Sequence, residues 1–312
     1  MISQKHLIVV GGATATGKTR AAIALARHFD TEILSADSRQ FFREMSIGTA
    51  KPTSGELAQA PHHFINSHSI VDEYAVGDYE RDALALLEGI FQKKDTAVLV
   101  GGSGLFIRAL CEGLDAFPPV PPGIREELEA VFEKMGLAPL QAELLEKDPV
   151  YYHQVDIQNP QRLMRALSVC RASGRPYSSF RSRTASERPF TPIYILLKIE
   201  RKALYERINQ RVDGMMADGL LEEARSLFPH RHLNALQTVG YQELFEHIEG
   251  RVSLEEAIEQ IKMNTRRYAK RQETWFRKDP HWQSFSPGDT EGMVRHVHQK
   301  ITSFLITPPS SR

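Results

Sequence analysis

The chain has 312 residues, of which 41% are hydrophobic and 25% are charged, and its 39 basic and 39 acidic residues cancel at pH 7. This length allows one large core or two smaller ones, and the neutral balance excludes the strongly basic composition of many nucleic-acid-binding domains. No apolar run reaches the length of a membrane span, and the N-terminus leads into a predicted strand rather than a signal peptide, so we expect a cytoplasmic protein without a membrane partner.

The first predicted elements are a strand, a glycine-rich loop and a helix. The apolar run His6–Val10 predicts the strand, and helical spacing of apolar residues follows the loop. The loop fits the P-loop pattern G-x-x-x-x-G-K-[ST], whose backbone N–H groups surround phosphate oxygens. It consists of Gly12, Ala13, Thr14, Ala15, Thr16, Gly17, Lys18 and Thr19. Lys18 adds a positive charge and the Thr19 hydroxyl can bind Mg²⁺, so the loop predicts a diphosphate or polyphosphate site.

An acidic residue follows the second predicted strand, Thr31–Ser35. Ligands of parallel α/β sheets lie beyond the carboxyl ends of the strands, so we expect Asp37 near the bound phosphates. There it could hold Mg²⁺ or act as a general base, and the alternative is a capping or turn aspartate.

The third predicted strand, Thr96–Val100, runs into the turn Gly101–Gly104 and a further helix. Ser103 in this turn can donate to an anion or cap the helix. An acid that usually ends this strand in nucleotide hydrolases is missing, which argues against an ATPase motor.

The order of elements predicts an α/β fold with a P-loop NTPase-like core, a parallel sheet flanked by helices, and an inserted helical lobe. We expect the core at 1–116 and 191–302 and the lobe at 117–190, after the proline-rich hinge Phe117–Pro122. The strand Ile193–Leu197 resumes the sheet, and long helices over 202–228, 237–248 and 254–277 complete the core. The tail 303–312 is expected to fray.

Two segments are locally basic. Seven basic residues and one acid lie between Lys262 and Lys278, where Lys262, Arg266 and Lys270 recur every four residues on one helix face. Between Pro160 and Arg188 only Glu187 is acidic, and the arginines are Arg162, Arg165, Arg171, Arg175, Arg181, Arg183 and Arg188. Such segments suit a phosphate backbone, and the alternative is a pair of solvated helix faces.

Seven motifs together resemble the bacterial tRNA dimethylallyltransferase (tRNA isopentenyltransferase) family. They occur in the family's order over nearly the whole chain: G-A-T-A-T-G-K-T, S-A-D-S-R-Q, I-G-T-A-K-P from Ile47, V-G-G-S-G-L from Val100, N-P-Q-R from Asn159, V-G-Y from Val239 and K-R-Q-x-T-W from Lys270. The resemblance implies transfer of a dimethylallyl group from dimethylallyl diphosphate to N6 of the adenosine 3′ to the anticodon, in tRNAs reading codons that begin with U. It also implies Mg²⁺, and we expect a monomer that contacts the anticodon stem-loop.

The resemblance also implies roles for individual residues. Asp37, Ser103, Lys18 and Thr19 would be catalytic, with Asp37 taking the proton from N6 and Thr19 binding the metal. Arg211 would join the residues Gly12–Thr19 at the substrate diphosphate. The tRNA would contact Asp37, Ser38, Arg39, Gln40, Ser103, Arg125, Gln161, Arg162, Leu163, Met164, Arg165, Lys270, Arg271 and Arg277.

Three other functions are compatible with parts of the sequence. A P-loop kinase for a nucleotide or small molecule explains the loop and the acid but leaves the basic segments unexplained. An enzyme that prenylates free adenine nucleotides would share the chemistry but not the arginine-rich lobe. An RNA-binding regulator could use the P-loop only as a fold element, but it would have no need for Lys18, Thr19 and Asp37 together.

Overall fold

The computed structural model describes residues 4–181 and 186–306. The chain divides into two compact units, one formed by Met1–Glu112 with Glu187–Arg312 and the other by Gly113–Ser186. The lobe boundaries predicted from the sequence, 117 and 190, each lie four residues later in the chain than the boundaries of this second unit.

The first unit is built on a six-stranded sheet with the order β3-β2-β4-β1-β5-β6, and all neighbouring strands are parallel. The strands are β1 (His6–Gly12), β2 (Ile33–Ser35), β3 (His62–His63), β4 (Thr96–Gly101), β5 (Thr191–Leu197) and β6 (Gln283–Phe285). All residues of β1 are buried, as expected for a central strand covered on both faces. This confirms the predicted parallel α/β sheet.

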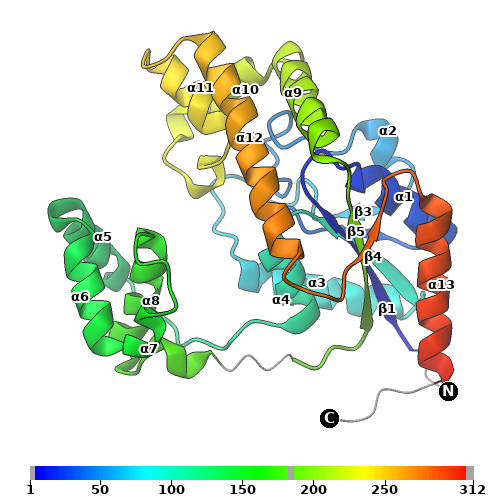
Figure 1. Ribbon diagram of the computed structural model, residues 1–312, viewed down its shortest axis with the longest axis horizontal. Helices are drawn as coiled ribbons and strands as arrows, with labels where there is room; N and C mark the ends of the chain where they lie inside the picture. The colour runs from blue at the N-terminus through cyan, green and yellow to red at the C-terminus, as the bar shows by residue number, and fades with distance from the viewer. Residues whose placement is uncertain (1–3, 182–185, 307–312) are drawn as a thin grey trace. The chain divides into compact units, whose positions relative to one another are not determined.

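Helices cover both faces of this sheet (Figure 1). Leu7 and Val9 of β1 pack with α3 (Val76–Phe91) and α4 (Gly104–Glu112) on one face. Their neighbours Ile8 and Val10 point to the other face, where the core includes residues of α1 (Lys18–His28) and α13 (Thr290–Ile306). The short helix α2 (Ser54–Leu57) follows β2 along the chain and precedes β3.

A second core of the same unit lies among helices that follow β5. These are α9 (Arg201–Ala217), α10 (Leu220–Leu227), α11 (Tyr241–Ile248) and α12 (Leu254–Phe276), with short 3₁₀ turns at Phe228–His230 and Asn234–Leu236. The side chains of Tyr241, Leu244 and Ile261 are buried in this cluster with Met45 from the loop after β2. The predicted single helix over 202–228 was wrong in one respect, because the chain breaks at Asp218–Gly219 into α9 and α10.

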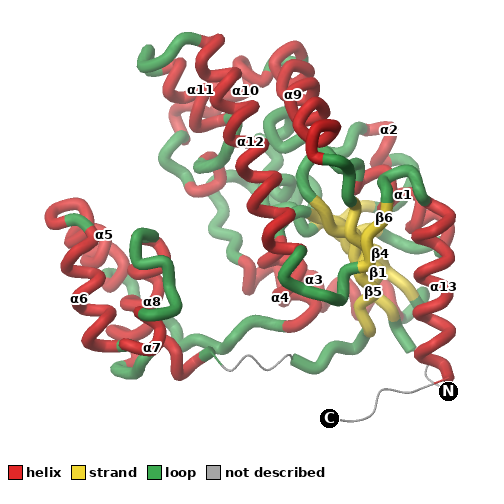
Figure 2. Tube along the Cα trace, viewed as in Figure 1, coloured by secondary structure: helices red, strands yellow, loops and turns green. Residues whose placement is uncertain are grey.

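All regular secondary structure in the described residues of the second unit is helical, and loops connect the helices (Figure 2). It contains α5 (Ile124–Met135), α6 (Leu137–Lys147), α7 (Pro149–Tyr152), α8 (Pro160–Ser173) and a 3₁₀ turn at Tyr177–Phe180. Leu128, Leu140, Leu144 and Leu167 form its own hydrophobic core. The buried Asp148 carboxylate accepts from the backbone of Tyr151 and Ser178 and so ties α7 to the 3₁₀ turn.

The tail differs from its prediction at its beginning. We expected fraying from Ser303, but α13 continues through Ile306. Residues 307–312 lie outside the described residues.

Candidate active site

The P-loop connects β1 to α1 and is held by internal hydrogen bonds. The Ala13 carbonyl accepts from the Thr16 hydroxyl at 2.8 Å and from Lys18 Nζ at 2.7 Å. Ala15 has φ 62°, a left-handed conformation that is strained for a residue other than glycine. These bonds within the loop hold its backbone in the conformation that the structure shows.

The segments that carry Asp37 and Ser103 are joined by a hydrogen bond. Asp37 lies two residues after β2, and its Oδ1 accepts from the backbone N–H of Arg39 at 3.0 Å. Ser103 lies between β4 and α4, and its Oγ accepts from the backbone N–H of Ser38 at 3.3 Å. Because β2 and β4 are adjacent and parallel, their carboxyl ends bring these two segments together.

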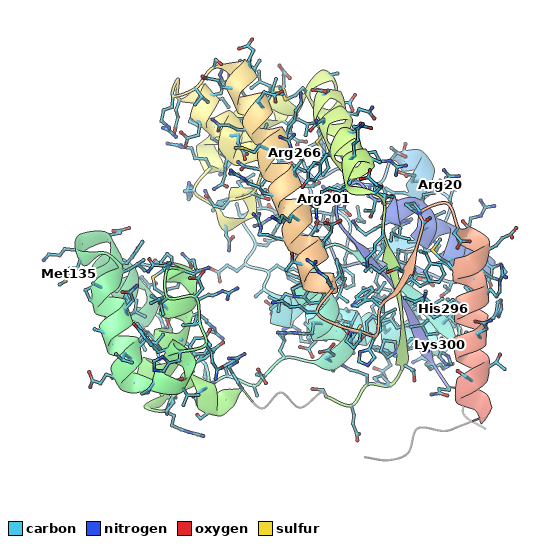
Figure 3. All side chains as sticks on the ribbon, in the orientation of Figure 1. Arg20, Met135, Arg201, Arg266, His296 and Lys300 are labelled. Atoms are coloured by element: carbon cyan, nitrogen blue, oxygen red, sulfur yellow. The ribbon has the colours of Figure 1, made fainter. Side chains whose placement is uncertain are left out.

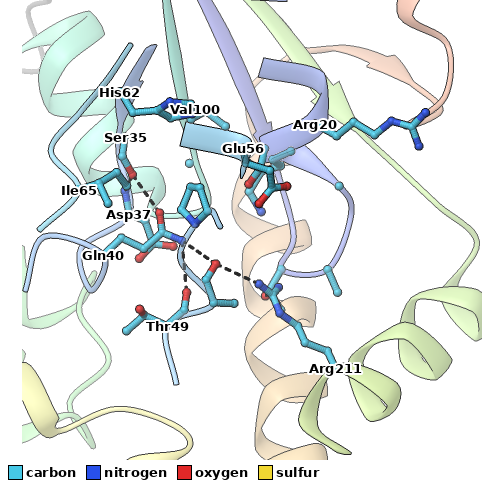
Figure 4. Close-up of a pocket in the computed structure, with 18 of the residues that line it drawn as sticks. Arg20, Ser35, Asp37, Gln40, Thr49, Glu56, His62, Ile65, Val100 and Arg211 are labelled. Carbon is cyan, nitrogen blue, oxygen red and sulfur yellow. Dashed lines mark hydrogen bonds between the residues drawn. The ribbon is translucent and has the colours of Figure 1, made fainter. Parts of the chain in front are cut away.

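A cavity of about 370 Å³ lies over the P-loop (Figure 4). Lys18 and Thr19 line it from the loop side, Asp37 and Gln40 from the segment after β2, and Arg211 from α9. The cavity thus combines cations, backbone amides of a P-loop and a carboxylate, which is the donor set expected around a diphosphate and a proton acceptor.

A smaller cavity of about 120 Å³ adjoins the first one. Both are lined by a shared set of residues, which are Thr14, Asp37, Thr49, Ala50, Arg211 and Tyr268. The remaining walls of the smaller cavity are largely apolar and include Ile208, Val212, Met215, Leu220, Val239 and Ile261. Asp37 therefore borders a phosphate-type cavity and an apolar cavity at once.

Arg211 and Gln40 link the walls of these cavities. Arg211 Nη1 donates to the Thr14 hydroxyl at 3.2 Å, and Nη2 donates to the Ala50 carbonyl at 3.4 Å. Gln40 Nε2 donates to the Thr49 carbonyl at 3.2 Å and to that of Ala50 at 3.3 Å (Figure 4). The Gln40 side chain thus holds the cavity wall.

The loop that contains Thr49 and Ala50 is fixed from behind by Glu223 of α10. One carboxylate oxygen accepts from the N–H groups of Ser46 at 2.9 Å and Ile47 at 2.8 Å. The other accepts from Gly48 N–H at 3.0 Å and from the Tyr241 hydroxyl at 2.6 Å. A side chain on Gly48 would have no room, because a Cβ there would lie 2.6 Å from the Tyr241 ring.

Three residues of the site were given no individual role by the sequence reasoning. Gln272 of α12 bonds to the P-loop, Tyr268 of α12 lines both cavities, and Arg207 lies one helical turn before Arg211 on the wall of the larger cavity. Arg207 could have been found from its four-residue spacing to Arg211. Gln272 could have been found as a polar residue on the otherwise apolar face of a predicted helix that includes Ala269 and Phe276.

Two side chains of the site have strongly shifted pKa values. Burial lowers the pKa of Lys18 to about 8, an effect that the nearby Asp37 carboxylate opposes and Arg211 reinforces. Partial burial, with Asp37 close by, raises the pKa of Tyr268 to about 12. The Tyr268 hydroxyl therefore stays protonated at neutral pH.

The second unit carries the arginines that we expected to contact RNA. Gln161, Arg162 and Arg165 are exposed on α8, and the Arg165 guanidinium lies 5.3 Å from the centre of the Phe117 ring. Arg125 is exposed on α5 but is paired with Glu129 at 2.8 Å. The side chains of Leu163 and Met164, which we also expected at the tRNA, are buried in the core of this unit.

Other arginines of the basic segment 160–188 have partners within the protein. Arg171 pairs with Glu143 at 2.6 Å, and Arg188 is held by Glu80 and by the Ala109 carbonyl in the first unit. Arg183 lies outside the described residues. Only part of this segment therefore presents free charge to a partner.

The basic stripe on α12 is likewise divided. Lys262 pairs with Asp213 at 2.8 Å and Glu259 at 3.0 Å. Arg266 (Figure 3) donates to Asn209 Oδ1 at 2.6 Å. The exposed basic residues of the segment 262–278 are Arg267, Lys270, Arg271, Arg277 and Lys278, and four of these five lie at or beyond Lys270.

Three histidines that are close in the sequence, His62, His63 and His68, have other partners. His62 bonds to the Ala60 carbonyl, His63 pairs with Glu32, and His68 stacks on Tyr74. Within residues 4–181 and 186–306, no three His, Cys, Asp or Glu side chains are arranged to bind a metal. A membrane span is also not found there, since each described helix is too short or too polar to cross a bilayer.

Comparison with known proteins gives consistent results. A family model described as IPP transferase matches residues 40–279. The tRNA dimethylallyltransferase of Christiangramia forsetii is 52% identical over 300 residues, which cover 96% of this chain and 99% of that protein.

Solved structures agree with this result. The full-length tRNA isopentenylpyrophosphate transferase of Bacillus halodurans is 32% identical, with a TM-score of 0.72, and the match covers 97% of this chain and 100% of that chain. A eukaryotic dimethylallyltransferase acting on tRNA shares the fold with a TM-score of 0.78 at 23% identity, covering 99% of this chain and 81% of that chain. Because the family model spans most of the chain and the relatives cover it almost completely, the chain belongs to the IPP transferase family.

Proposed function

We propose that this protein transfers the dimethylallyl group of dimethylallyl diphosphate to N6 of the adenosine that follows the anticodon on its 3′ side, in tRNAs reading codons that begin with U. The products are N6-(dimethylallyl)adenosine and diphosphate. The observation that carries the proposal is the position of Asp37 on the border between the P-loop cavity and the apolar cavity. The relative that is 52% identical to this protein is named tRNA dimethylallyltransferase, and not a kinase or a nucleotide prenyltransferase.

The P-loop side of the site suits the leaving group. Breaking the allylic C–O bond moves negative charge onto the diphosphate, and fixed amides and cations placed there stabilise that charge. Lys18 and Arg211 line the cavity with the P-loop amides, and the bonds of Arg211 to Thr14 and Ala50 hold its guanidinium in place.

The residues present also fit Mg²⁺. The Thr19 hydroxyl and the Asp37 carboxylate line the same cavity, and Mg²⁺ prefers oxygen ligands that include substrate phosphates. We assign Thr19 as the residue that would hold the ion, which would add positive charge beside the diphosphate.

Asp37 suits the acceptor side. The lone pair on adenine N6 is delocalised into the ring, so the amine attacks well only if its proton is removed as the N–C bond forms. Asp37 would accept that proton while the C–O bond to diphosphate breaks. The apolar walls of the smaller cavity, such as Val212, Leu220 and Ile261, suit an uncharged organic group next to the carboxylate.

The acceptor base must leave the anticodon loop before it can react. The exposed side chains of Lys270, Arg271 and Arg277 on the first unit and of Arg125, Arg162 and Arg165 on the second are the phosphate contacts that we propose. The backbone around Leu163 and Met164 and the polar side chain of Gln161 complete the tRNA surface of α8. The cytoplasmic location and the monomeric state stay predictions.

One experiment tests the proposal directly. The protein is incubated with dimethylallyl diphosphate, Mg²⁺ and unmodified tRNA, and the digested nucleosides are analysed by mass. The expected result is N6-(dimethylallyl)adenosine at one position, which parallel reactions with tRNA variants locate next to the anticodon. Product on free adenosine monophosphate instead, or ATP turnover stimulated by a small acceptor, would identify one of the alternative enzymes.

A further inference from the structure

The side chain of Gln272 is fixed at both ends between two glycine-rich segments of the site. It projects from α12 and is only 7% exposed. Gln272 Oε1 accepts from the Thr14 N–H of the P-loop at 2.9 Å. Gln272 Nε2 donates to the Gly102 carbonyl at 2.9 Å. A buried amide with both of its ends bonded has one orientation, and it sets the distance between its partners.

The turn after β4 is shaped to receive this side chain. A Cβ on Gly102 would lie 2.3 Å from Gln272 Nε2, so any larger residue there would displace the amide. Close by on the same helix, Trp275 packs on Gly104, where a Cβ would lie 2.3 Å from the indole. Close packing between α12 and the turn therefore depends on the side chains of Gln272 and Trp275 and on the absence of side chains at Gly102 and Gly104.

Both partners of Gln272 belong to the reacting part of the site. Thr14 supplies a P-loop amide with its backbone and holds Arg211 with its hydroxyl. Gly102 is followed directly by Ser103, which bonds to the segment that contains Asp37. The Gln272 amide thus joins the diphosphate loop to the segments that position the proton acceptor.

We propose that Gln272 is a positioning residue that holds the Thr14 half of the P-loop against the Gly102 turn in the geometry that binds the substrate diphosphate. The inference rests on the proposed function for the identity of that substrate, but the binding of a diphosphate by the P-loop can be tested without it. Gln272 is the Q of the K-R-Q-x-T-W motif. The inference gives it a role in the diphosphate site, whereas the exposed neighbours Lys270 and Arg271 are proposed to contact tRNA phosphates.

The test uses three variants of the full chain. Gln272→Leu removes both hydrogen bonds at similar volume, and Gly102→Ala displaces the amide from the other side. Gln272→Glu keeps an acceptor for Thr14 but loses the donor to Gly102 unless its carboxyl is protonated. We expect the Kd for inorganic pyrophosphate and the KM for dimethylallyl diphosphate to rise about tenfold to a hundredfold in all three, with the KM for tRNA changed by less than about twofold. The Gln272→Glu defect should shrink as the pH falls.

Asn264→Ala is the matched control. Asn264 lies on the same helix, eight residues earlier, and donates to the buried Glu243 carboxylate at 2.7 Å without touching the P-loop. This variant should lose a comparable hydrogen bond and thermal stability while keeping pyrophosphate affinity. Parent-like pyrophosphate affinity in Gln272→Leu and Gly102→Ala, or an equal loss in Asn264→Ala, would overturn the inference. Absence of prenyl transfer in the parent, with the pyrophosphate pattern intact, would refute the proposed function and leave Gln272 in its role.

Discussion

At the scale of single residues, Asp37 borders both the P-loop cavity and the apolar cavity, and its hydrogen bond to the backbone allows its role as proton acceptor to be tested. Asp37 Oδ1 accepts from the Arg39 N–H, a bond that an asparagine oxygen can also accept. Asp37→Asn should therefore keep the local backbone while it removes the proton acceptor and the negative charge beside Lys18. We expect turnover to fall about a hundredfold to ten-thousandfold with tRNA affinity nearly unchanged, measured by single-turnover kinetics and by filter binding. A turnover close to that of the parent would show that another group takes the proton.

Lys18 makes the diphosphate site sensitive to pH. Burial lowers its pKa to about 8, so the unliganded loop loses a positive charge as the pH rises through that value. We expect the charged form to bind, so the apparent Kd for pyrophosphate should rise by about tenfold per pH unit above that value, beyond the change that the ionisation of pyrophosphate itself causes, with proton uptake on binding. Calorimetry in buffers of different ionisation enthalpy measures both effects. Lys18→Arg, which stays charged, should show no such rise, and a flat profile in the parent would contradict the assignment.

At the scale of elements, the sequence predicted the parts of the site that follow strands. The P-loop, Asp37 and Ser103 each come directly after a buried apolar run, and the parallel sheet brings such ends together. The site residues on helices α10 and α12 could not be predicted in this way, because they do not follow a strand. Gln272 is a polar residue in a basic segment, and its partners Thr14 and Gly102 lie 258 and 170 residues away. The strands β3 and β6 were also missed, because two and three residues are too few to show a period.

The clamp made by Glu223 on the loop after β2 is an element-scale feature that the sequence did not reveal. Its carboxylate accepts hydrogen bonds from three backbone N–H groups and from the Tyr241 hydroxyl. In Glu223→Gln one of the two accepting oxygens becomes an NH₂ group, which cannot accept from these donors. We expect a loss of about 1–3 kcal/mol in the free energy of unfolding and a lower kcat/KM, since the clamped loop carries Thr49 and Ala50 of the cavity walls.

Urea unfolding and steady-state kinetics measure these two effects. Tyr241→Phe, which removes one of four bonds, should show a smaller change of the same kind. Glu222→Gln is the control, because it neutralises the exposed neighbouring acid on the same helix. If Glu223→Gln behaves like Glu222→Gln, the loop does not depend on the clamp.

At the scale of the whole molecule, neutral total charge conceals a local separation. In the second unit the acids gather on α5 and α6, whereas no acid lies between Arg162 and Arg181. The sequence indicated correctly that this segment is basic. It could not show which arginines form ion pairs within the protein, because a pair such as Arg171 with Glu143 depends on how the helices pack. Arg162 and Arg165 remain exposed on one helix, which suits a phosphate backbone.

Removing these two arginines should therefore weaken tRNA binding through charge rather than through folding. Each lost phosphate contact should reduce the slope of log K against log salt by about one and leave the Kd for pyrophosphate unchanged, because that ligand binds in the other unit. Arg162→Ala and Arg165→Ala are compared with Lys134→Ala, which removes an exposed positive charge from α5, beside the acids. Affinity for tRNA is measured at several salt concentrations for the parent and the three variants. If Lys134→Ala changes the slope as much as the arginine variants do, net charge alone drives binding. If none of the three changes it, the RNA does not follow α8.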